Sequence, residues 1–145
     1  MKTLLIIEDG DEYEAFACLF LKAAYDLVAV HSAEEALNFL NTQKVDGFLI
    51  DLRFDRAPES VLAGDIETTA GRLFAGDRSK AVGYLKDNQG TFILAELRQQ
   101  GHTQRALFVH DFAQKRLHNL RQLYGDVEAV PSFDAAMILR AFNNP

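Results

Sequence analysis

The sequence has one cysteine and no long hydrophobic run, and each shortage excludes a class of protein. A lone cysteine, Cys18, cannot build an internal disulfide framework or a cysteine zinc site, and it fits a reducing compartment. We expect its side chain to pack as a small apolar group. No apolar run approaches the roughly 18 residues that a membrane-spanning helix needs. The apolar run before Glu8 is also too short for the core of a signal peptide. The sequence therefore predicts a cytoplasmic protein without a membrane partner.

Basic residues are also scarce. The chain has 15 Lys and Arg against 21 Asp and Glu, which gives a formal net charge of −6. Nucleic acid requires a basic surface to balance its phosphates, so we exclude it as a partner of this chain alone. The 145 residues, 48% of them hydrophobic, suffice for one buried core but not for two full domains. We expect a single domain that spans residues 1–145.

Short apolar runs alternate with helical patterns along most of the chain. The runs predict strands at residues 4–7, 27–30, 45–50, 106–109 and 127–130. Apolar spacings of three and four predict helices at residues 11–24, 91–100, 113–124 and 135–142. A further helix follows Ser32, which forms a capping box with Glu35. Alternation of short strands with helices implies right-handed crossovers and a parallel sheet covered on both faces. The predicted fold class is α/β, a flavodoxin-like (βα)5 doubly wound parallel sheet with strand order 2-1-3-4-5.

An inserted segment at about residues 54–89 interrupts this alternation, between the third strand and the third helix. It is far longer than the roughly 2–6 residues of ordinary connections in α/β folds. Within it, residues 66–74 and 78–85 have the pattern of short helices, and their apolar content exceeds that of a solvated linker. We expect a partly ordered lid or docking element rather than a disordered loop.

Acidic residues follow two of the central strands directly. Glu8 and Asp9 follow the first strand and Asp51 ends the third, and ligands of doubly wound sheets bind at these carboxyl ends. At ~5 Å and an effective dielectric constant of ~20, two ionised carboxylates repel by about 3 kcal/mol. Three together require protonation or a cation, and Mg²⁺ is the hard cation that prefers such oxygen ligands. The alternative is that Glu8 and Asp9 cap the next helix and Asp51 starts a turn.

Three stretches of sequence carry a family resemblance. Leu5-Ile6-Ile7-Glu8-Asp9-Gly10, His31-Ser32-Ala33-Glu34-Glu35-Ala36-Leu37 and Phe48-Leu49-Ile50-Asp51-Leu52 resemble the first half of a response-regulator receiver domain of two-component signalling. The resemblance covers residues 3–53 and, more loosely, 89–142. It implies that Asp51 accepts a phosphoryl group from a histidine kinase or phosphotransfer protein. It also implies that Glu8, Asp9, Asp51 and the backbone carbonyl of Arg53 hold Mg²⁺.

The second half departs from the family pattern at the positions that read out phosphorylation. His110 stands where receivers place Ser or Thr, Val130 stands for the lysine before Pro131, and Val127 stands for the aromatic switch residue. By the same resemblance we expect the Val130–Pro131 peptide bond to be cis.

Two substitutes for the missing phosphate contacts are available. His110 could donate to a phosphoryl group, and we expect neighbouring carboxylates to raise its pKa. Arg53 or Arg56 could offer a planar fork to phosphate oxygens. The alternatives are that His110 bonds Asp111 or a backbone carbonyl and that both arginines lie on the surface.

Three functional hypotheses follow. The first is a stand-alone receiver-like signalling protein that is phosphorylated on Asp51 with Mg²⁺ and then changes its binding to a downstream protein partner. The second is a pseudo-receiver, a protein-interaction module that acts independently of phosphorylation and docks through the insertion and the apolar stripe of the 113–124 helix. The third, a small Mg²⁺-dependent phosphoryl-transfer enzyme, ranks last because no general base or substrate pocket supports it. We therefore expect no enzyme activity beyond self-phosphorylation and dephosphorylation at Asp51.

Overall fold

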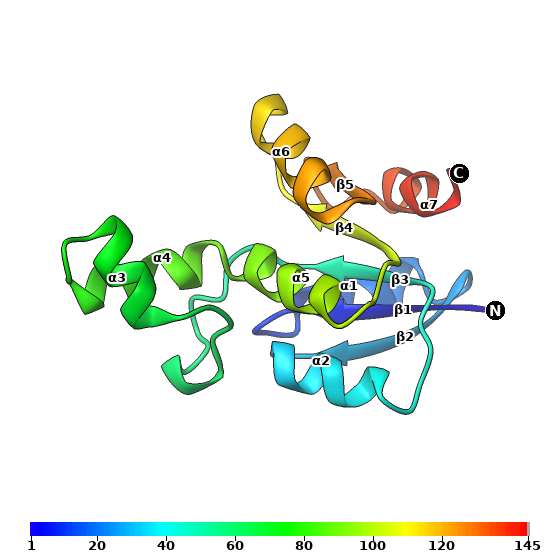
Figure 1. The fold of residues 1–145 in the computed structure, drawn as a ribbon. Coiled ribbons are helices and arrows are strands. Elements are labelled where there is room, and N and C mark those ends of the chain that lie inside the picture. Colours follow the sequence, from blue (N-terminus) through cyan, green and yellow to red (C-terminus); the bar gives the residue numbers. More distant parts are fainter. Residues whose placement is uncertain (145) are drawn as a thin grey trace.

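A parallel sheet lies at the centre of the computed structural model, which describes residues 1–144 (Figure 1). Its strands in this part of the chain are β1 (Lys2–Ile7), β2 (Tyr25–Val30), β3 (Gly47–Ile50), β4 (Arg105–Val109) and β5 (Val127–Val130). All neighbouring strands pair in parallel, in the order β2-β1-β3-β4-β5. The predicted fold class and strand order are confirmed.

Helices cover both faces of this sheet, as a doubly wound fold requires. They are α1 (Glu12–Phe20), α2 (Ala33–Leu40), α3 (Ile66–Leu73), α4 (Arg78–Asp87), α5 (Gln89–Gln99), α6 (Gln114–Tyr124) and α7 (Ala135–Asn143), with a short 3-10 helix η1 (Glu59–Val61). Helices α2, α5 and α6 pack on one face and α1 and α7 on the other. Within residues 1–144, no helix is both long and apolar enough to cross a bilayer.

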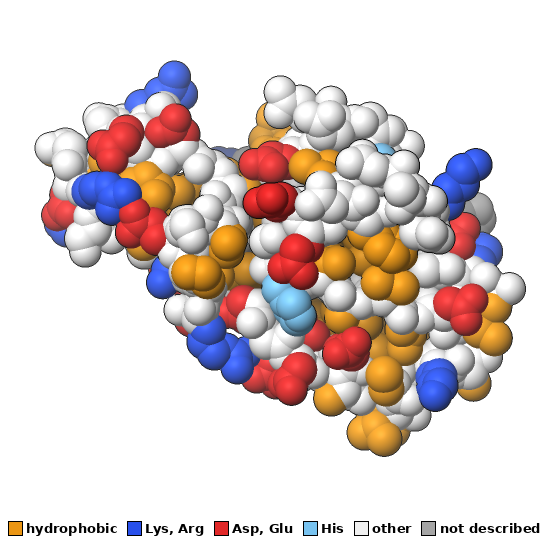
Figure 2. Space-filling model, turned by 90° about the horizontal axis from the view of Figure 1, so that it is seen from below, with side chains coloured by type: hydrophobic (Ala, Val, Ile, Leu, Met, Phe, Trp, Pro, Cys, Tyr) orange, Lys and Arg blue, Asp and Glu red, His pale blue; other side chains and the backbone are white. Residues whose placement is uncertain are grey.

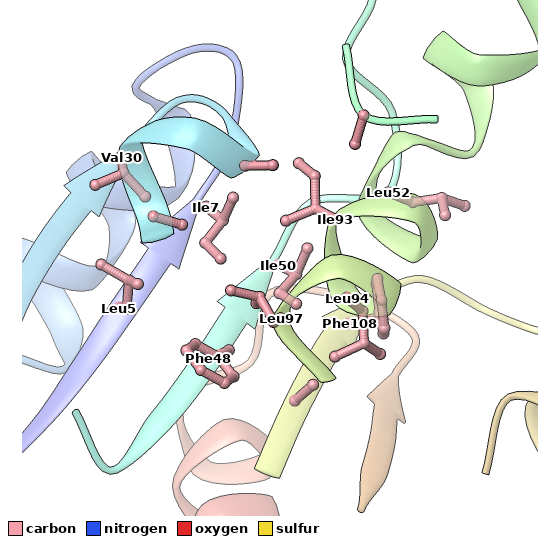
Figure 3. Close-up of a cluster of buried hydrophobic side chains, with 14 of the residues drawn as sticks. Leu5, Ile7, Val30, Phe48, Ile50, Leu52, Ile93, Leu94, Leu97 and Phe108 are labelled. Atoms are coloured by element: carbon pink, nitrogen blue, oxygen red, sulfur yellow. The ribbon is translucent and has the colours of Figure 1, made fainter. Parts of the chain in front are cut away.

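The alternation of side chains along β1 explains why its sequence is continuously apolar. Leu5 and Ile7 enter the core beneath α2 and α5, shown in Figure 3, whereas Leu4 and Ile6 enter the core beneath α1 and α7. Because both faces are covered, all four residues from Leu4 to Ile7 are buried.

Helix boundaries differ from the predicted ones mainly where a helix ends. Helix α1 ends at Phe20 rather than at residue 24, because a turn begins at the buried Leu21. The Leu21 carbonyl accepts a hydrogen bond from the backbone N–H of Tyr25. The cap predicted for α2 is present, since the Ser32 hydroxyl accepts a hydrogen bond of 3.1 Å from the Glu35 N–H. Cys18 is exposed, so the expectation that it packs as a core residue was wrong.

The insertion is helical, and both helices expected in it are present as α3 and α4. They project from the sheet on the side of the strands' carboxyl ends (Figure 1). Each begins at an aspartate whose side chain accepts a backbone N–H, Asp65 for α3 and Asp77 for α4.

The side chain of Gln89 attaches the insertion to the main fold. Its oxygen accepts a hydrogen bond of 2.6 Å from Ala63 N–H, and its amide nitrogen donates to the carbonyls of Ala63 and Leu85 at 3.1 Å. Gln89 is 1% exposed, so these hydrogen bonds are shielded from water. The segment before α3 and the last part of α4 are therefore fixed to the first residue of α5.

Candidate functional site

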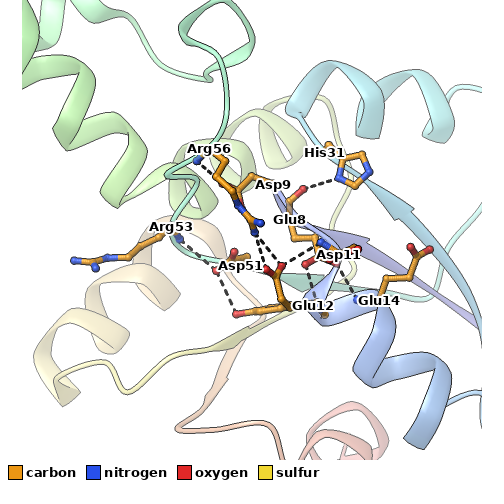
Figure 4. Close-up of polar contacts among 10 residues, drawn as sticks. Glu8, Asp9, Asp11, Glu12, Glu14, His31, Asp51, Arg53 and Arg56 are labelled. Carbon is orange, nitrogen blue, oxygen red and sulfur yellow. Dashed lines mark hydrogen bonds and ion pairs between the residues drawn. The ribbon is translucent and has the colours of Figure 1, made fainter.

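Glu8 follows β1 and points into the first turn of α1 (Figure 4). One carboxylate oxygen accepts the N–H of Tyr13 at 2.9 Å, and the other accepts the N–H of Glu14 at 2.8 Å. Burial raises the pKa of Glu8, and these two N–H groups oppose the rise. The carboxylate thus satisfies the unpaired donors at the start of α1, as the helix-capping alternative states. A metal ion would have to compete with α1 for both oxygens.

Asp9 is bound by Arg56, which lies near the start of the inserted segment. Its Oδ2 accepts a hydrogen bond of 2.7 Å from the backbone N–H of Arg56, and its Oδ1 lies 3.6 Å from the Arg56 guanidinium. The same guanidinium donates to both carboxylate oxygens of Glu12 at 2.9 Å, which lowers the pKa of Glu12. Figure 4 shows Arg56 folded back over these acids. Arg56 therefore supplies a positive charge next to Asp9 from within the chain.

Asp51 stands at the carboxyl end of β3 and is half-buried. Its Oδ1 accepts hydrogen bonds from the Tyr13 hydroxyl at 3.3 Å and from the Arg53 N–H at 3.4 Å. Burial is the largest cause that raises the pKa of Asp51 to about 6, and the negative charges of Asp9 and Glu8 add to the rise. The charges of Glu8 and Asp9 therefore reach Asp51, although both acids also have other partners.

Tyr13 is a site residue that the sequence did not reveal. Its spacing along α1 marks it only as apolar, and its ring is indeed buried. The hydroxyl, however, reaches Asp51 and also lies 3.5 Å from the carbonyl of Val109 at the end of β4. Burial first, and then the charges of Asp51 and Glu8, raise the pKa of Tyr13, so the hydroxyl keeps its proton and acts as a donor. The only available signal was a tyrosine one helical turn after the acid pair.

Solved structures provide the comparison that decides the fold family. A response regulator receiver protein from Pseudomonas putida is 17% identical over 99% of this chain and 97% of that chain, with a TM-score of 0.62. A signal receiver domain from Vibrio parahaemolyticus is 13% identical over 97% and 87% of the two chains, with a TM-score of 0.65. This chain has the receiver-domain fold.

A third structure with the receiver fold was solved in a modified state. It is a response regulator protein from Burkholderia pseudomallei with a phosphorylated aspartic acid, a calcium ion and citrate. It is 16% identical, the match covers 99% of this chain and 68% of that chain, and the TM-score is 0.63. No family model and no curated protein matches the sequence. The resemblance read from the sequence is therefore confirmed at the level of the fold.

His110 occupies a position after β4 in this receiver fold, but its charge environment is not the expected one. Burial lowers the pKa of His110, the charges of Arg116 and Arg53 lower it further, and only Asp111 opposes them. The prediction of a raised pKa was wrong, because burial first, and then the two guanidinium groups, outweigh the one carboxylate, Asp111. The imidazole packs against the Phe112 ring, and the centroids of the two rings lie 4.7 Å apart.

The two arginines predicted as phosphate contacts differ in position. The Arg53 side chain is exposed and directed away from Asp51 in Figure 4, as the surface alternative states. The Arg56 side chain is also exposed, at 60%, but it lies on Asp9 and Glu12. A cation that sequence reasoning missed is Arg116 of α6, which donates to Asn88 at 2.7 Å. Its guanidinium carbon lies 5.0 Å from the centre of the Phe112 ring.

The β5 positions that carry readout residues in the receiver family are apolar and buried here. Val127 packs under α6 and Val130 packs on the α1 and α7 side. No peptide bond among the described residues is cis, so the prediction of a cis Val130–Pro131 bond was wrong. Trans is the more stable isomer of an X–Pro bond by about 0.5–1 kcal/mol unless the surrounding structure selects cis. The trans chain reaches Asp134, whose side chain caps α7.

The apolar stripe of α6 belongs to the core. Phe112 and Leu120 are buried, and Leu117 and Tyr124 pack against the same cluster. The stripe therefore does not provide the docking surface that the pseudo-receiver hypothesis placed there. Acidic side chains gather near the centre of the face shown in Figure 2.

The acid site fits a divalent cation only in part. Within residues 1–144, no group of three or more His, Cys, Asp or Glu side chains is arranged to hold a metal ion. The negative charge of Asp9 nevertheless acts on Asp51, and two carboxylates with a backbone carbonyl are within the usual requirement of Mg²⁺. Burial is the largest cause of the raised pKa of Asp51 and neighbouring negative charge adds to it, so a cation between the two aspartates would relieve the repulsive part.

Proposed function

We propose that this chain is a receiver-like signalling protein that accepts a phosphoryl group on Asp51 and then changes its binding to a partner protein. The observation that carries the proposal is the arrangement of Asp51, which ends the central strand β3 with both of its hydrogen-bond donors on Oδ1. The second oxygen, Oδ2, is left as the nucleophile. The phosphorylated aspartic acid of the Burkholderia pseudomallei response regulator supports the same chemistry for this fold.

The proposed reaction transfers a phosphoryl group from a phosphohistidine to Asp51. Oδ2 of Asp51 attacks the phosphorus of a phosphohistidine on a histidine kinase or phosphotransfer protein. The P–O bond forms as the P–N bond breaks, the electron pair leaves with the histidine nitrogen, and Asp51 becomes an acyl phosphate. The N–H of Arg53 and the hydroxyl of Tyr13 hold the carboxylate by Oδ1 during the attack.

Asp9, Asp51 and the backbone carbonyl of Arg53 are the groups that would hold Mg²⁺. When bound, the ion neutralises charge on the transferred phosphoryl group. Arg56 already places one positive charge beside Asp9, so the arginine and the ion compete for the same carboxylate. Glu8 contributes by fixing the first turn of α1, on which Tyr13 stands.

A second candidate is the pseudo-receiver, which would bind its partner without phosphorylation. Three observations favour it, namely the guanidinium beside Asp9, the capping role of Glu8 and the buried valine at position 130. In this case Asp51 would remain a free carboxylate and the insertion would be the docking element.

A phosphorylation assay distinguishes the two candidates. Incubation of the purified protein with acetyl phosphate and Mg²⁺ should add the mass of one phosphoryl group to the intact protein, because Oδ2 of Asp51 is the available nucleophile. The Asp51→Asn variant should gain nothing. If the wild-type protein also gains no mass and binds no Mg²⁺, the pseudo-receiver is the correct function.

Removal of the Arg56 guanidinium tests the competition for Asp9. Arg56→Ala should bind Mg²⁺ about three- to tenfold more tightly, because the guanidinium lies 3.6 Å from Asp9 and repels a cation, although solvent screens part of this repulsion. Isothermal titration calorimetry at constant ionic strength measures this change.

The matched control is Arg78→Ala, which removes an ion-paired arginine from the same insertion at its contact with Glu67. It should leave Mg²⁺ affinity unchanged. Equal affinities in the wild-type protein and Arg56→Ala would contradict the competition, and the absence of binding in both would contradict the proposed ligand set.

A further inference from the structure

A row of aromatic rings leads from Asp51 to the surface formed by α1 and the loop before α7. The Tyr13 ring meets the ring of Phe133 edge to face, with centroids 4.4 Å apart and an interplanar angle of 86°. Phe133 lies 4.6 Å from Phe16, and Phe16 lies 4.9 Å from Phe20. Phe20 is 57% exposed, so the row begins at the candidate phosphoacceptor and ends in solvent.

The Tyr13 hydroxyl has one proton and two acceptors within reach. Oδ1 of Asp51 lies at 3.3 Å and the carbonyl oxygen of Val109 at 3.5 Å. An ionised carboxylate accepts a hydrogen bond more strongly than a neutral carbonyl, so the free Asp51 holds the hydroxyl. When Oδ2 is esterified by phosphate, Oδ1 becomes a neutral carbonyl and loses this advantage. The hydroxyl can then turn to Val109 or to a phosphoryl oxygen.

We propose that Tyr13 is a positioning residue that holds the Asp51 carboxylate and couples its state to Phe133 and Phe16. This inference rests on the proposed function for its biological role, but the coupling itself is a property of the unmodified chain. The coupling needs neither a hydroxyl at the end of β4 nor an aromatic residue in β5, the two features that His110 and Val127 replace. The Tyr13 and Phe133 rings meet edge to face and the Phe133 and Phe16 rings are in tilted contact, and closely packed rings of this kind transmit a displacement to one another.

The three phenylalanine rings lie beside the start of α7, which their displacement would therefore affect. Phe16, Phe20 and Phe133 line a shallow groove of about 300 Å³ together with Asp134, Ala135 and Ala136. Asp134 caps α7 by accepting the N–H of Met137, so a shift of Phe133 acts directly on the start of that helix.

The first experiment needs no phosphoryl donor. Asp51→Asn replaces the charged acceptor with a neutral amide of the same shape, and should shift the ring resonances of Phe133 and Phe16 in ¹H–¹³C NMR spectra. In a Tyr13→Phe background, which keeps the ring but removes the hydroxyl, the same Asp51→Asn change should no longer shift them. Shifts that persist without the hydroxyl would overturn the proposal, since a merely structural role of the ring predicts no such loss.

Tyr25→Phe is the matched control. Tyr25 is also buried, and its hydroxyl donates a hydrogen bond of 3.4 Å to Asn143, away from Asp51. In this background, Asp51→Asn should shift Phe133 and Phe16 as it does in the wild-type protein. Loss of the shifts in both tyrosine variants would mean that general loosening of the core is responsible, and would also overturn the proposal.

A second experiment separates this inference from the proposed function. Beryllofluoride with Mg²⁺ should shift the Arg53 amide and the Phe133 and Phe16 rings in the wild-type protein, but only the Arg53 amide in Tyr13→Phe. If the wild-type Arg53 amide does not respond, the proposed phosphoacceptor role fails, while the Asp51→Asn experiment still decides the role of Tyr13.

Discussion

Asp51→Asn is expected to stabilise the protein at pH 7 by about 1–3 kcal/mol, although most substitutions of half-buried residues destabilise. The reason is the charge of Asp51, whose pKa rises from the model-compound value of 3.8 to about 6 in the folded chain because of burial and the nearby carboxylates. At pH 7 the folded protein has to keep this carboxylate ionised against burial and repulsion. Asparagine keeps an acceptor oxygen at the same position, within reach of the Arg53 N–H, and removes the charge.

The stabilisation has a defined pH dependence. The folded state binds the Asp51 proton more tightly than the unfolded state, so this group favours folding most below pH 3.8 and loses that contribution as pH rises through about 6. Each pKa unit corresponds to about 1.4 kcal/mol, and partial exposure reduces the full difference to the range given above. The stabilisation of the fold by Asp51→Asn should therefore be largest above about pH 6 and vanish below about pH 3.8.

Urea unfolding at pH 7 and at about pH 3.5 measures both values. The control is Asp55→Asn, because Asp55 is exposed in the same loop, and it should change the free energy of unfolding by less than about 0.5 kcal/mol at pH 7. An equal effect of Asp51→Asn at the two pH values would show that charge is not the cause.

Gly90→Ala is expected to destabilise the fold by about 1–3 kcal/mol, the usual effect of overfilling a packed interior. A Cβ at this position would overlap the carbonyl oxygen of Asp51 and come within 2.9 Å of the Phe108 ring. A hydrogen bond also fixes the distance between the two backbone segments, since the Gly90 N–H donates to the carbonyl of Leu52 at 3.0 Å. The backbone of α5 therefore contacts the backbone of the candidate phosphoacceptor directly.

The same substitution at Gly83 is expected to have the opposite effect on stability. Gly83 lies in the exposed middle of α4, and a Cβ there would meet nothing within 4 Å. Alanine should stabilise α4 by about 0.5–1 kcal/mol through its better helix propensity. Thermal unfolding of the two variants should move the midpoint in opposite directions, and a Gly90→Ala protein as stable as wild type would contradict the close packing described here.

The fold could be predicted because burial determines the sequence pattern of each strand and helix. The run from Leu4 to Ile7 is apolar throughout since β1 has helices on both faces, and the alternation of strands with helices then restricts the topology. Helix ends such as that of α1 were less well predicted, because they depend on single turns around buried residues such as Leu21.

The positions of the three acids in the fold could be predicted, but their contacts could not. The position of Asp51 follows from strand order, whereas the pairing of Asp9 with Arg56 joins residues 47 positions apart through a loop without periodicity. The pKa of His110 depends first on burial and then on Arg116, which periodicity places only on a helix surface. Tyr13 was missed because hydrophobic spacing reports where a ring lies and carries no information about its hydroxyl.

The amide of Gln89 connects the projecting helices of the insertion to the candidate phosphoacceptor Asp51. Gln89 holds the chain before α3 by its buried hydrogen bonds to Ala63, and the next residue, Gly90, rests against Asp51. A pull on α3 or α4 would therefore reach the first turn of α5 through Gln89 and the carboxyl end of β3 through Gly90. The hydrogen bond of 2.9 Å from the Phe54 N–H to the carbonyl of Lys86 joins α4 to the same end of β3.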